Sequence, residues 1–144
     1  MRTLSLIIPY FNDFKTIGNC LDSIFIQDIP DDWKVDVIVV DDASRISCKE
    51  YIKNHLKNIH LVVNEINLGP AKSRNRGVNE SNGELIAFVD ADVELGVDWI
   101  KNAIYFMEKT TVAGGQGKIV PSGDGMFDRF RKKLISQQTK EVVY

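Results

Sequence analysis

The sequence lacks the features that mark several large classes of protein. Its 144 residues include only two cysteines, Cys20 and Cys48, too few for a disulfide framework and too far apart for a zinc motif. No stretch approaches the roughly 20 apolar residues that span a bilayer, and the amino end has no signal-peptide cleavage site. The net charge of −2 argues against a protein that binds nucleic acid by neutralising phosphates. These absences predict one cytoplasmic domain over residues 1–144, with two reduced and buried thiols.

Several motifs of well-known enzyme classes are missing too. The sequence has no G-x-x-x-x-G-K-[ST] phosphate loop, no complete dinucleotide fingerprint and no G-x-S-x-G nucleophile elbow. It also lacks the acidic pair after the first strand that a phosphoacceptor receiver module needs. The two histidines, His55 and His60, are explained better as ordinary surface or core residues than as metal ligands.

Four short apolar runs predict a buried parallel sheet. They are rich in β-branched residues and nearly continuous, which is typical of strands buried on both faces; they span residues 4–8, 35–40, 59–63 and 85–89. Helical spacing lies between them, in residues 17–25, 47–56 and 70–80. This alternation predicts an α/β fold, a three-layer α/β/α sandwich with a mainly parallel sheet.

Polar residues at the expected helix starts predict their caps. Asn12 or Asp13 can cap the first helix, Ser47 can open the second within a capping box, and Asp98 can cap a helix that follows the fourth strand. Beyond that helix, residues 111–120 predict a strand weakened by glycine, and residues 122–125 predict a loop.

The last predicted element is a helix over residues 126–138. It has an apolar stripe beside basic side chains, formed by Phe127, Phe130, Leu134 and Ile135 next to Arg129, Arg131, Lys132 and Lys133. Two alternatives stay open for this stripe. It can pack against a further part of the protein or a second copy of the chain, or it can contact an anionic membrane that bears a lipid-linked acceptor.

Acidic residues follow two of the predicted strands. In an open parallel sheet, ligands bind beyond the carboxyl ends of the strands. Asp41 and Asp42 follow the second strand, and Asp90 and Asp92 follow the fourth. Such crowding of like charges is costly unless a cation compensates it. Asp90 and Asp92 are expected to point the same way in an extended segment, where Mg²⁺ or Mn²⁺ fits better than zinc.

Four segments in register resemble a known family. They read SLIIPYFN (5–12), VIVVDDAS (37–44), NLGPAKSRNRG (67–77) and GELIAFVDAD (83–92). Their order and spacing resemble those of family 2 glycosyltransferases, which are inverting, sugar-nucleotide-dependent enzymes of the GT-A fold. The resemblance covers about residues 3–120, and four blocks in register are far more specific than a lone D-x-D.

The resemblance implies roles for individual residues. Pro9, Phe11 and Asn12 would line a base pocket, with the Phe11 ring against a uracil-like base. Asp41 would accept a hydrogen bond from the base. The third loop and helix would approach the nucleotide through Gly69, Lys72 and Asn75.

Simpler readings remain for the third loop and helix. Gly69 can be a turn glycine only, and Lys72 can be a solvated helix charge. Arg74 and Asn75 can satisfy backbone groups within the fold.

The acidic pair would serve the sugar and phosphate end of the donor. Asp90 would hold ribose or a metal-bound water, and both Asp90 and Asp92 would form the metal site, with Asp92 as the direct ligand of Mn²⁺ or Mg²⁺. The implied partners are a nucleotide-sugar donor, with a UDP-sugar favoured, and a glycan or lipid-linked acceptor.

Family members continue beyond the length seen here. The resemblance implies a hexosyltransferase-like enzyme of polysaccharide or cell-envelope glycan synthesis, at the inner face of the membrane if the final helix contacts it. The acceptor-binding part and the general base are expected beyond Tyr144, so no catalytic residue is assigned within residues 1–144. A noncatalytic nucleotide-sugar-binding module is the alternative.

Overall fold

The computed structural model describes residues 1–55 and 59–118. By spatial proximity the chain divides into two compact units, Met1–Thr110 and Thr111–Tyr144. The first contains all of the helices and strands assigned within the described residues. Within those residues, no helix has the length and apolar character needed to cross a membrane.

The first unit is built on a four-stranded parallel sheet. The strands are β1 (Arg2–Tyr10), β2 (Trp33–Asp41), β3 (Ile59–Val63) and β4 (Leu85–Phe88), in the order β3-β2-β1-β4. Each pair of neighbours is parallel, and the register places Tyr10 beside Asp41 and Asp41 beside Val63. The carboxyl ends of β1, β2 and β3 therefore meet at one edge of the sheet.

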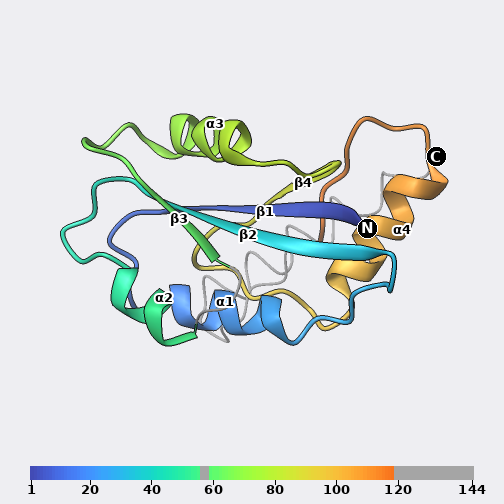
Figure 1. Cartoon of the computed structure of the whole chain (residues 1–144), viewed down its shortest axis with the longest axis horizontal. Helices are drawn as coiled ribbons and strands as arrows, with labels where there is room; N and C mark the ends of the chain where they lie inside the picture. The colour runs from blue at the N-terminus through green and yellow to red at the C-terminus, as the bar shows by residue number, and fades with distance from the viewer. Residues whose placement is uncertain (56–58, 119–144) are drawn as a thin grey trace, which may run out of the picture. The chain divides into compact units, whose positions relative to one another are not determined.

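Helices cover both faces of this sheet (Figure 1). They are α1 (Ile17–Phe25), α2 (Lys49–His55), α3 (Pro70–Glu80) and α4 (Trp99–Lys109). One core cluster joins α1, α2 and α4 to the side chains of β1 at Leu4, Leu6, Ile8 and Tyr10, while a smaller cluster on the other face joins Ile7, Ile38, Val40 and Val62 to Val78 of α3. The predicted three-layer α/β/α sandwich is confirmed.

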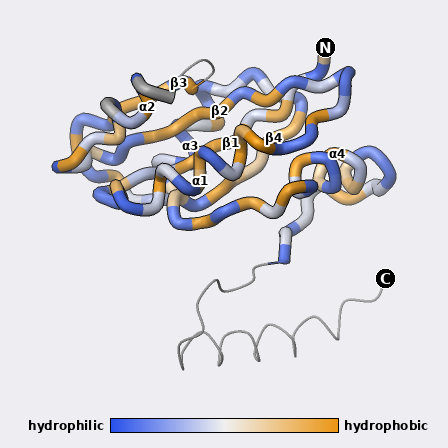
Figure 2. The backbone as a smooth tube through the Cα atoms, turned by 90° about the horizontal axis from the view of Figure 1, so that it is seen from below, coloured by the Kyte–Doolittle hydropathy of each residue, from blue (hydrophilic) through white to orange (hydrophobic). Residues whose placement is uncertain are grey.

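Burial explains why the predictions succeed for the two central strands, whereas the prediction of burial on both faces is wrong for the edge strands β3 and β4, in which Val63, Ile86 and Phe88 are exposed. β1 is buried or half-buried along its whole length, and Leu6, Ile7 and Ile8 are fully buried. Figure 2 shows long hydrophobic stretches along β1 and β2, the two strands in the middle of the sheet. A strand covered on both faces needs apolar side chains at successive positions, which is the pattern the sequence has.

A glycine lets α3 lie close to the sheet. A Cβ atom at Gly77 would be 2.4 Å from Cγ2 of Ile7 and 3.2 Å from Cγ2 of Val40. The first distance is shorter than carbon atoms tolerate, so a larger residue at position 77 would push α3 away from β1. The amino-terminal end of α3 is thereby held near the carboxyl ends of the strands.

Several helix caps differ from the predictions. Thr16, not Asn12 or Asp13, is the N-cap residue of α1, and the backbone oxygen of Asp13 accepts a hydrogen bond from the Ile17 amide at 3.2 Å. The side chain of Asn12 instead accepts a hydrogen bond from the Arg45 amide at 2.8 Å, which ties the first loop to the second.

Ser47 lies at the start of the second helix, with its Oγ accepting a hydrogen bond from the Lys49 amide at 3.2 Å, and the helix begins at Lys49. Asp98 is the N-cap residue of α4, but its side chain makes no capping hydrogen bond.

The strand predicted over residues 111–120 is wrong where the structure describes it. Residues 111–118 form neither strand nor helix. Three glycines, Gly114, Gly115 and Gly117, fall in this stretch, and glycine weakens a strand because it loses the most backbone entropy on ordering. The predicted loop at 122–125 and helix at 126–138 lie outside the described residues.

Ala43 adopts a left-handed backbone conformation, with φ of 58°. This conformation costs an L-residue roughly 1–2 kcal/mol, whereas glycine adopts it freely but loses about 0.5–1 kcal/mol through its unfolded-state entropy. We therefore predict that Ala43→Gly raises the free energy of unfolding by about 1 kcal/mol, measured by urea denaturation. Ala87→Gly, in the strand β4, is the matched control and should lower it; an equal loss in both variants would contradict the prediction.

Candidate functional site

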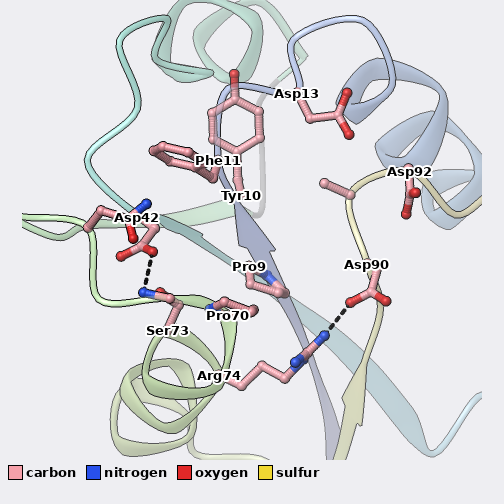
Figure 3. A pocket seen from close by; sticks show the side chains of 13 residues that line it. Pro9, Tyr10, Phe11, Asp13, Asp42, Pro70, Ser73, Arg74, Asp90 and Asp92 are labelled. Atoms are coloured by element: carbon pink, nitrogen blue, oxygen red, sulfur yellow. Dashed lines mark hydrogen bonds and ion pairs between the residues drawn. The ribbon is translucent and has the colours of Figure 1, made fainter.

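A cavity of about 590 Å³ opens beyond the carboxyl ends of β1 and β4, next to the start of α3 (Figure 3). Its lining combines apolar side chains with four carboxylates and one arginine. Its lining residues are Pro9, Tyr10, Phe11, Asp13, Asp42, Asn67, Gly69, Pro70, Ser73, Arg74, Asp90, Ala91 and Asp92. Figure 3 shows Phe11 and Asp42 on one side of the cavity, with Asp13, Asp90 and Asp92 on the opposite side.

The buried carboxylate of Asp42 organises one wall of the cavity. The residue is only 3% exposed. Its Oδ1 accepts hydrogen bonds from the Leu68 amide at 2.8 Å and from Nδ2 of Asn64 at 2.6 Å, and its Oδ2 accepts one from the Gly69 amide at 2.8 Å. One side chain at the end of β2 therefore fixes the loop that leads into α3.

Hydrogen bonds keep Asp42 ionised despite its burial. Burial alone would raise the pKa of this carboxyl, but hydrogen bonds from Leu68, Asn64, Gly69 and Ser73 outweigh it, so the pKa is lowered from its ordinary value. Donors that point at a carboxylate favour its charged form. The cavity wall therefore contains a negative charge that is already stabilised by backbone amides.

Asn64 connects the same wall to α3. It is 2% exposed, and its backbone amide donates to the backbone oxygen of Asp41 at 2.8 Å. Its side chain donates to Oγ of Ser73 at 3.1 Å and accepts from Nη1 of Arg76 at 2.6 Å. The ends of β2 and β3 and the inner side of α3 are thus joined by one buried polar network.

Asp41 does not line the cavity. Its side chain is 1% exposed, and its Oδ1 accepts a hydrogen bond from the Ser44 amide at 2.9 Å within its own loop. Successive side chains of a strand point to opposite faces, so only one of the two neighbouring acids can face the cavity. The structure gives that position to Asp42 instead of the predicted Asp41.

The acidic pair after β4 lies in a turn. The Val93 amide donates to the backbone oxygen of Asp90 at 3.0 Å, which closes the chain around Ala91 and Asp92. The prediction of an extended segment with two carboxylates pointing the same way is therefore wrong. Asp90 accepts a hydrogen bond from Nη2 of Arg74 at 2.5 Å, as Figure 3 shows, whereas Asp92 has no hydrogen bond or ion pair with the described residues.

The carboxylates of Asp90 and Asp92 are suited to a hard cation, but two protein ligands do not complete its coordination. Among the described residues there is no group of three or more His, Cys, Asp or Glu side chains that could hold a metal ion. The carboxylate oxygens of Asp92 have no partner among the described residues. The carboxylate of Asp90 is paired with Arg74, whose side chain is partly exposed. A divalent ion here would need further oxygen ligands from water or from a bound molecule, which is the usual situation of Mg²⁺ and its relatives.

Five of the predicted site residues lie in the cavity wall, and four do not. Those in the wall are Pro9, Phe11, Gly69, Asp90 and Asp92. Asn12, Lys72 and Asn75 are exposed and, like Asp41, lie outside the cavity wall.

The prediction from sequence missed the residues of α3 that face the cavity. Pro70, Ser73 and Arg74 follow each other at helical spacing, and that spacing alone could have separated them from Lys72. For Asp13 the sequence predicts only a possible helix cap, and nothing in the pattern around Tyr10 indicates a place in the cavity wall. Tyr10 also lines the cavity, although its ring belongs to the core cluster on the α1 side of the sheet and its hydroxyl donates to the backbone oxygen of Ile46 at 2.7 Å.

Comparison with known structures identifies the class of this fold. The mannosyltransferase PcManGT of Pyrobaculum calidifontis, solved with GDP-Man and Mn²⁺, matches with a TM-score of 0.70 and 29% identity over 76% of this chain and 33% of its own. TarS 1–349 of Staphylococcus aureus, solved with UDP-GlcNAc, matches with a TM-score of 0.69 and 27% identity over 83% of this chain and 38% of its own. The fold is that of GT-A glycosyltransferases.

The family follows from the sequence match. The family described as Glycosyl transferase family 2 matches residues 5–143, and the chain belongs to it. Among curated relatives, glycosyltransferase AglE of Haloferax volcanii is 27% identical over 97% of this chain and 47% of its own length. Poly(ribitol-phosphate) beta-N-acetylglucosaminyltransferase TarS of Staphylococcus aureus is 30% identical over 76% of this chain and 19% of its own length. The chain spans less than half the length of these two relatives.

The reactivity of the two buried thiols tests the effect of burial and of the nearby carboxylates on their pKa values. Burial, and then the negative charges of Asp92, Asp90 and Glu94, raise the pKa of Cys20 to about 12, while burial and the charge of Asp41 raise that of Cys48 to about 12.

We predict that neither thiol reacts with iodoacetamide in the native protein between pH 7 and about pH 9, because the thiolate is the reactive form. Both should react in urea with an ordinary pKa of about 8.5. Mass spectrometry counts the modified thiols; rapid alkylation of Cys20 in the folded protein at pH 8 would contradict the assignment.

Proposed function

We propose that the cavity binds the nucleotide part of a sugar-nucleotide donor, and that the complete protein transfers the sugar to an acceptor hydroxyl in cell-envelope glycan synthesis. The observation that carries this proposal is the pairing, in one cavity, of an exposed aromatic ring and a stabilised carboxylate on one side with an acidic pair and an arginine on the other. Family membership and the two similar structures with bound sugar nucleotides support it.

The side of the cavity that contains Phe11 and Asp42 is the proposed base end. Phe11 is 51% exposed although it is aromatic, so its ring is available for a planar ligand. An ionised carboxylate has about four sites for accepting hydrogen bonds; those of Asp42 receive the Leu68 and Gly69 amides, Asn64 and Ser73, so a base N–H would have to take the place of the Ser73 hydroxyl. We infer that Asp42, in place of the predicted Asp41, accepts a hydrogen bond from a ring N–H of uracil.

The opposite side is the proposed diphosphate end. The guanidinium of Arg74, which is paired with Asp90, can pair with a phosphate oxygen instead. Asp92 supplies free carboxylate oxygens. Asp92, with Asp90, would hold Mn²⁺ or Mg²⁺. When bound, such an ion stabilises the negative charge that a leaving diphosphate gains. The structure with GDP-Man and Mn²⁺ belongs to a relative and supports this choice of ion.

UDP is favoured over other nucleotides as the donor head group. Two TarS structures were solved with UDP or UDP-GlcNAc, whereas PcManGT was solved with GDP-Man, so the comparisons alone support both bases. The base end presents one carboxylate, Asp42, and one ring, Phe11. One carboxylate matches the single ring N–H of uracil.

Calorimetry with UDP, in Mn²⁺ and in EDTA, tests the proposal. We predict that UDP binds more tightly in Mn²⁺, and that Asp92→Asn removes most of this gain, weakening binding in Mn²⁺ by about tenfold or more, or roughly 1.4 kcal/mol. In EDTA the variant and the parent should bind UDP alike, because no ion then links Asp92 to the phosphates.

Asp98→Asn is the matched control, since Asp98 is an exposed acid on the same connection but does not line the cavity. It should bind UDP as the parent does. Equal UDP affinity of Asp92→Asn and the parent in Mn²⁺ would refute the metal assignment, and no binding of UDP under either condition would refute the nucleotide site.

A further inference from the structure

The connection between β4 and α4 contains both acids of the proposed metal site but has no regular structure of its own. Residues 89–98 form neither helix nor strand. Backbone amides and carbonyls that are buried without a partner are costly, so this connection needs hydrogen bonds from elsewhere. Its apolar residues Val89, Ala91 and Leu95 are buried, whereas Asp90 and Asp92 are exposed.

Side chains of α1 and the residues after it supply these hydrogen bonds. Oγ of Ser23 accepts from the Leu95 amide at 2.9 Å. Nε2 of Gln27 donates to the backbone oxygen of Gly96 at 2.8 Å, and its Oε1 accepts from the Ile100 amide at 3.1 Å. Both side chains belong to residues that are only 8% exposed.

The residues of α1 that contact this connection lie on one side of the helix. Asn19, Ser23 and Gln27 follow each other at intervals of four, which places them on one side of α1 and its extension. Asn19 donates to Oε1 of Glu94 at 3.1 Å. Ser23 and Gln27 are also linked, because Nε2 of Gln27 donates to the Ser23 backbone oxygen at 2.9 Å. We call Asn19, Ser23 and Gln27 the α1 polar row.

None of the three residues of the α1 polar row lines the cavity. Ser23 and Gln27 hold the backbone at Leu95 and Gly96, whereas Asn19 contacts only the side chain of Glu94. Oγ of Ser23 also donates to the backbone oxygen of Cys20 at 2.7 Å. Sγ of Cys20, in turn, donates to the backbone oxygen of Asp90 at 3.6 Å. The turn that presents Asp92 is therefore held to α1 on both of its sides.

We propose that Ser23 and Gln27 are positioning residues for the divalent-cation site: they set the place of the Asp92 carboxylate without touching the ion or the donor. This proposal rests on the proposed function. A cation with only two protein ligands depends strongly on where their oxygens lie, and changes to groups that orient metal ligands typically lower metal affinity by about 10–100-fold.

The test measures UDP affinity by calorimetry in Mn²⁺ and in EDTA and takes the ratio of the two dissociation constants. For Ser23→Ala, we predict that this ratio falls about tenfold relative to the parent, while affinity in EDTA changes little. Ser23→Thr keeps the hydroxyl and should restore the ratio. Gln27→Met, which keeps the length of the side chain but loses its hydrogen bonds, should act in the same direction as Ser23→Ala.

Loss of stability alone would not give this pattern. Val62→Ala truncates a residue of the core cluster on the opposite face of the sheet and serves as a control with a lowered melting temperature and an unchanged ratio. An unchanged ratio in folded Ser23→Ala and Gln27→Met would overturn the proposal. If the parent itself shows no gain from Mn²⁺, it is the metal site of the proposed function that fails.

Discussion

The site depends on one buried charge. The carboxylate of Asp42 receives the backbone amides of Leu68 and Gly69 and the side chain of Asn64, and these contacts join the end of β2 to the loop before α3. A charge this deeply buried is stable only when donors surround it. Because Gly69 has a φ of 83°, the loop can turn both amides toward the same carboxylate, and one wall of the cavity is fixed before any ligand binds.

The acids of the cavity differ in how their charges are satisfied. The charge of Asp42 is stabilised by backbone amides, that of Asp90 by the partly exposed side chain of Arg74, and that of Asp92 by no hydrogen bond or ion pair with a described residue. This gradation runs from the proposed base end to the proposed diphosphate end. A ligand with a polar ring and a diphosphate matches it, since the ring needs a fixed acceptor and the phosphates need exchangeable cations.

The sequence predicts the sheet well because the cause is local. Continuous apolar runs predict buried parallel strands, and all four strands are found near their predicted positions. The choice between Asp41 and Asp42 could not be made in this way. It depends on which face of β2 is covered by α3, and the packing of Ile38 and Val40 against Val78 shows that the even-numbered residues lie on that face. The role of Arg74 could not be predicted from the sequence either, because its ion pair with Asp90 joins elements that only the folded sheet brings together.

The central claim is that the edge organised by Asp42 is where the nucleotide binds. Amide NMR spectra during titration with UDP and Mg²⁺ test it most directly. The account predicts the largest shifts at Phe11, Gly69 and Ala91, with little change at Trp33 and Lys34 at the opposite ends of the strands. Replacing Mg²⁺ with Mn²⁺ should broaden the signals nearest Asp92 most. Shifts centred on the amino ends of the strands, or broadening away from Asp92, would contradict the account.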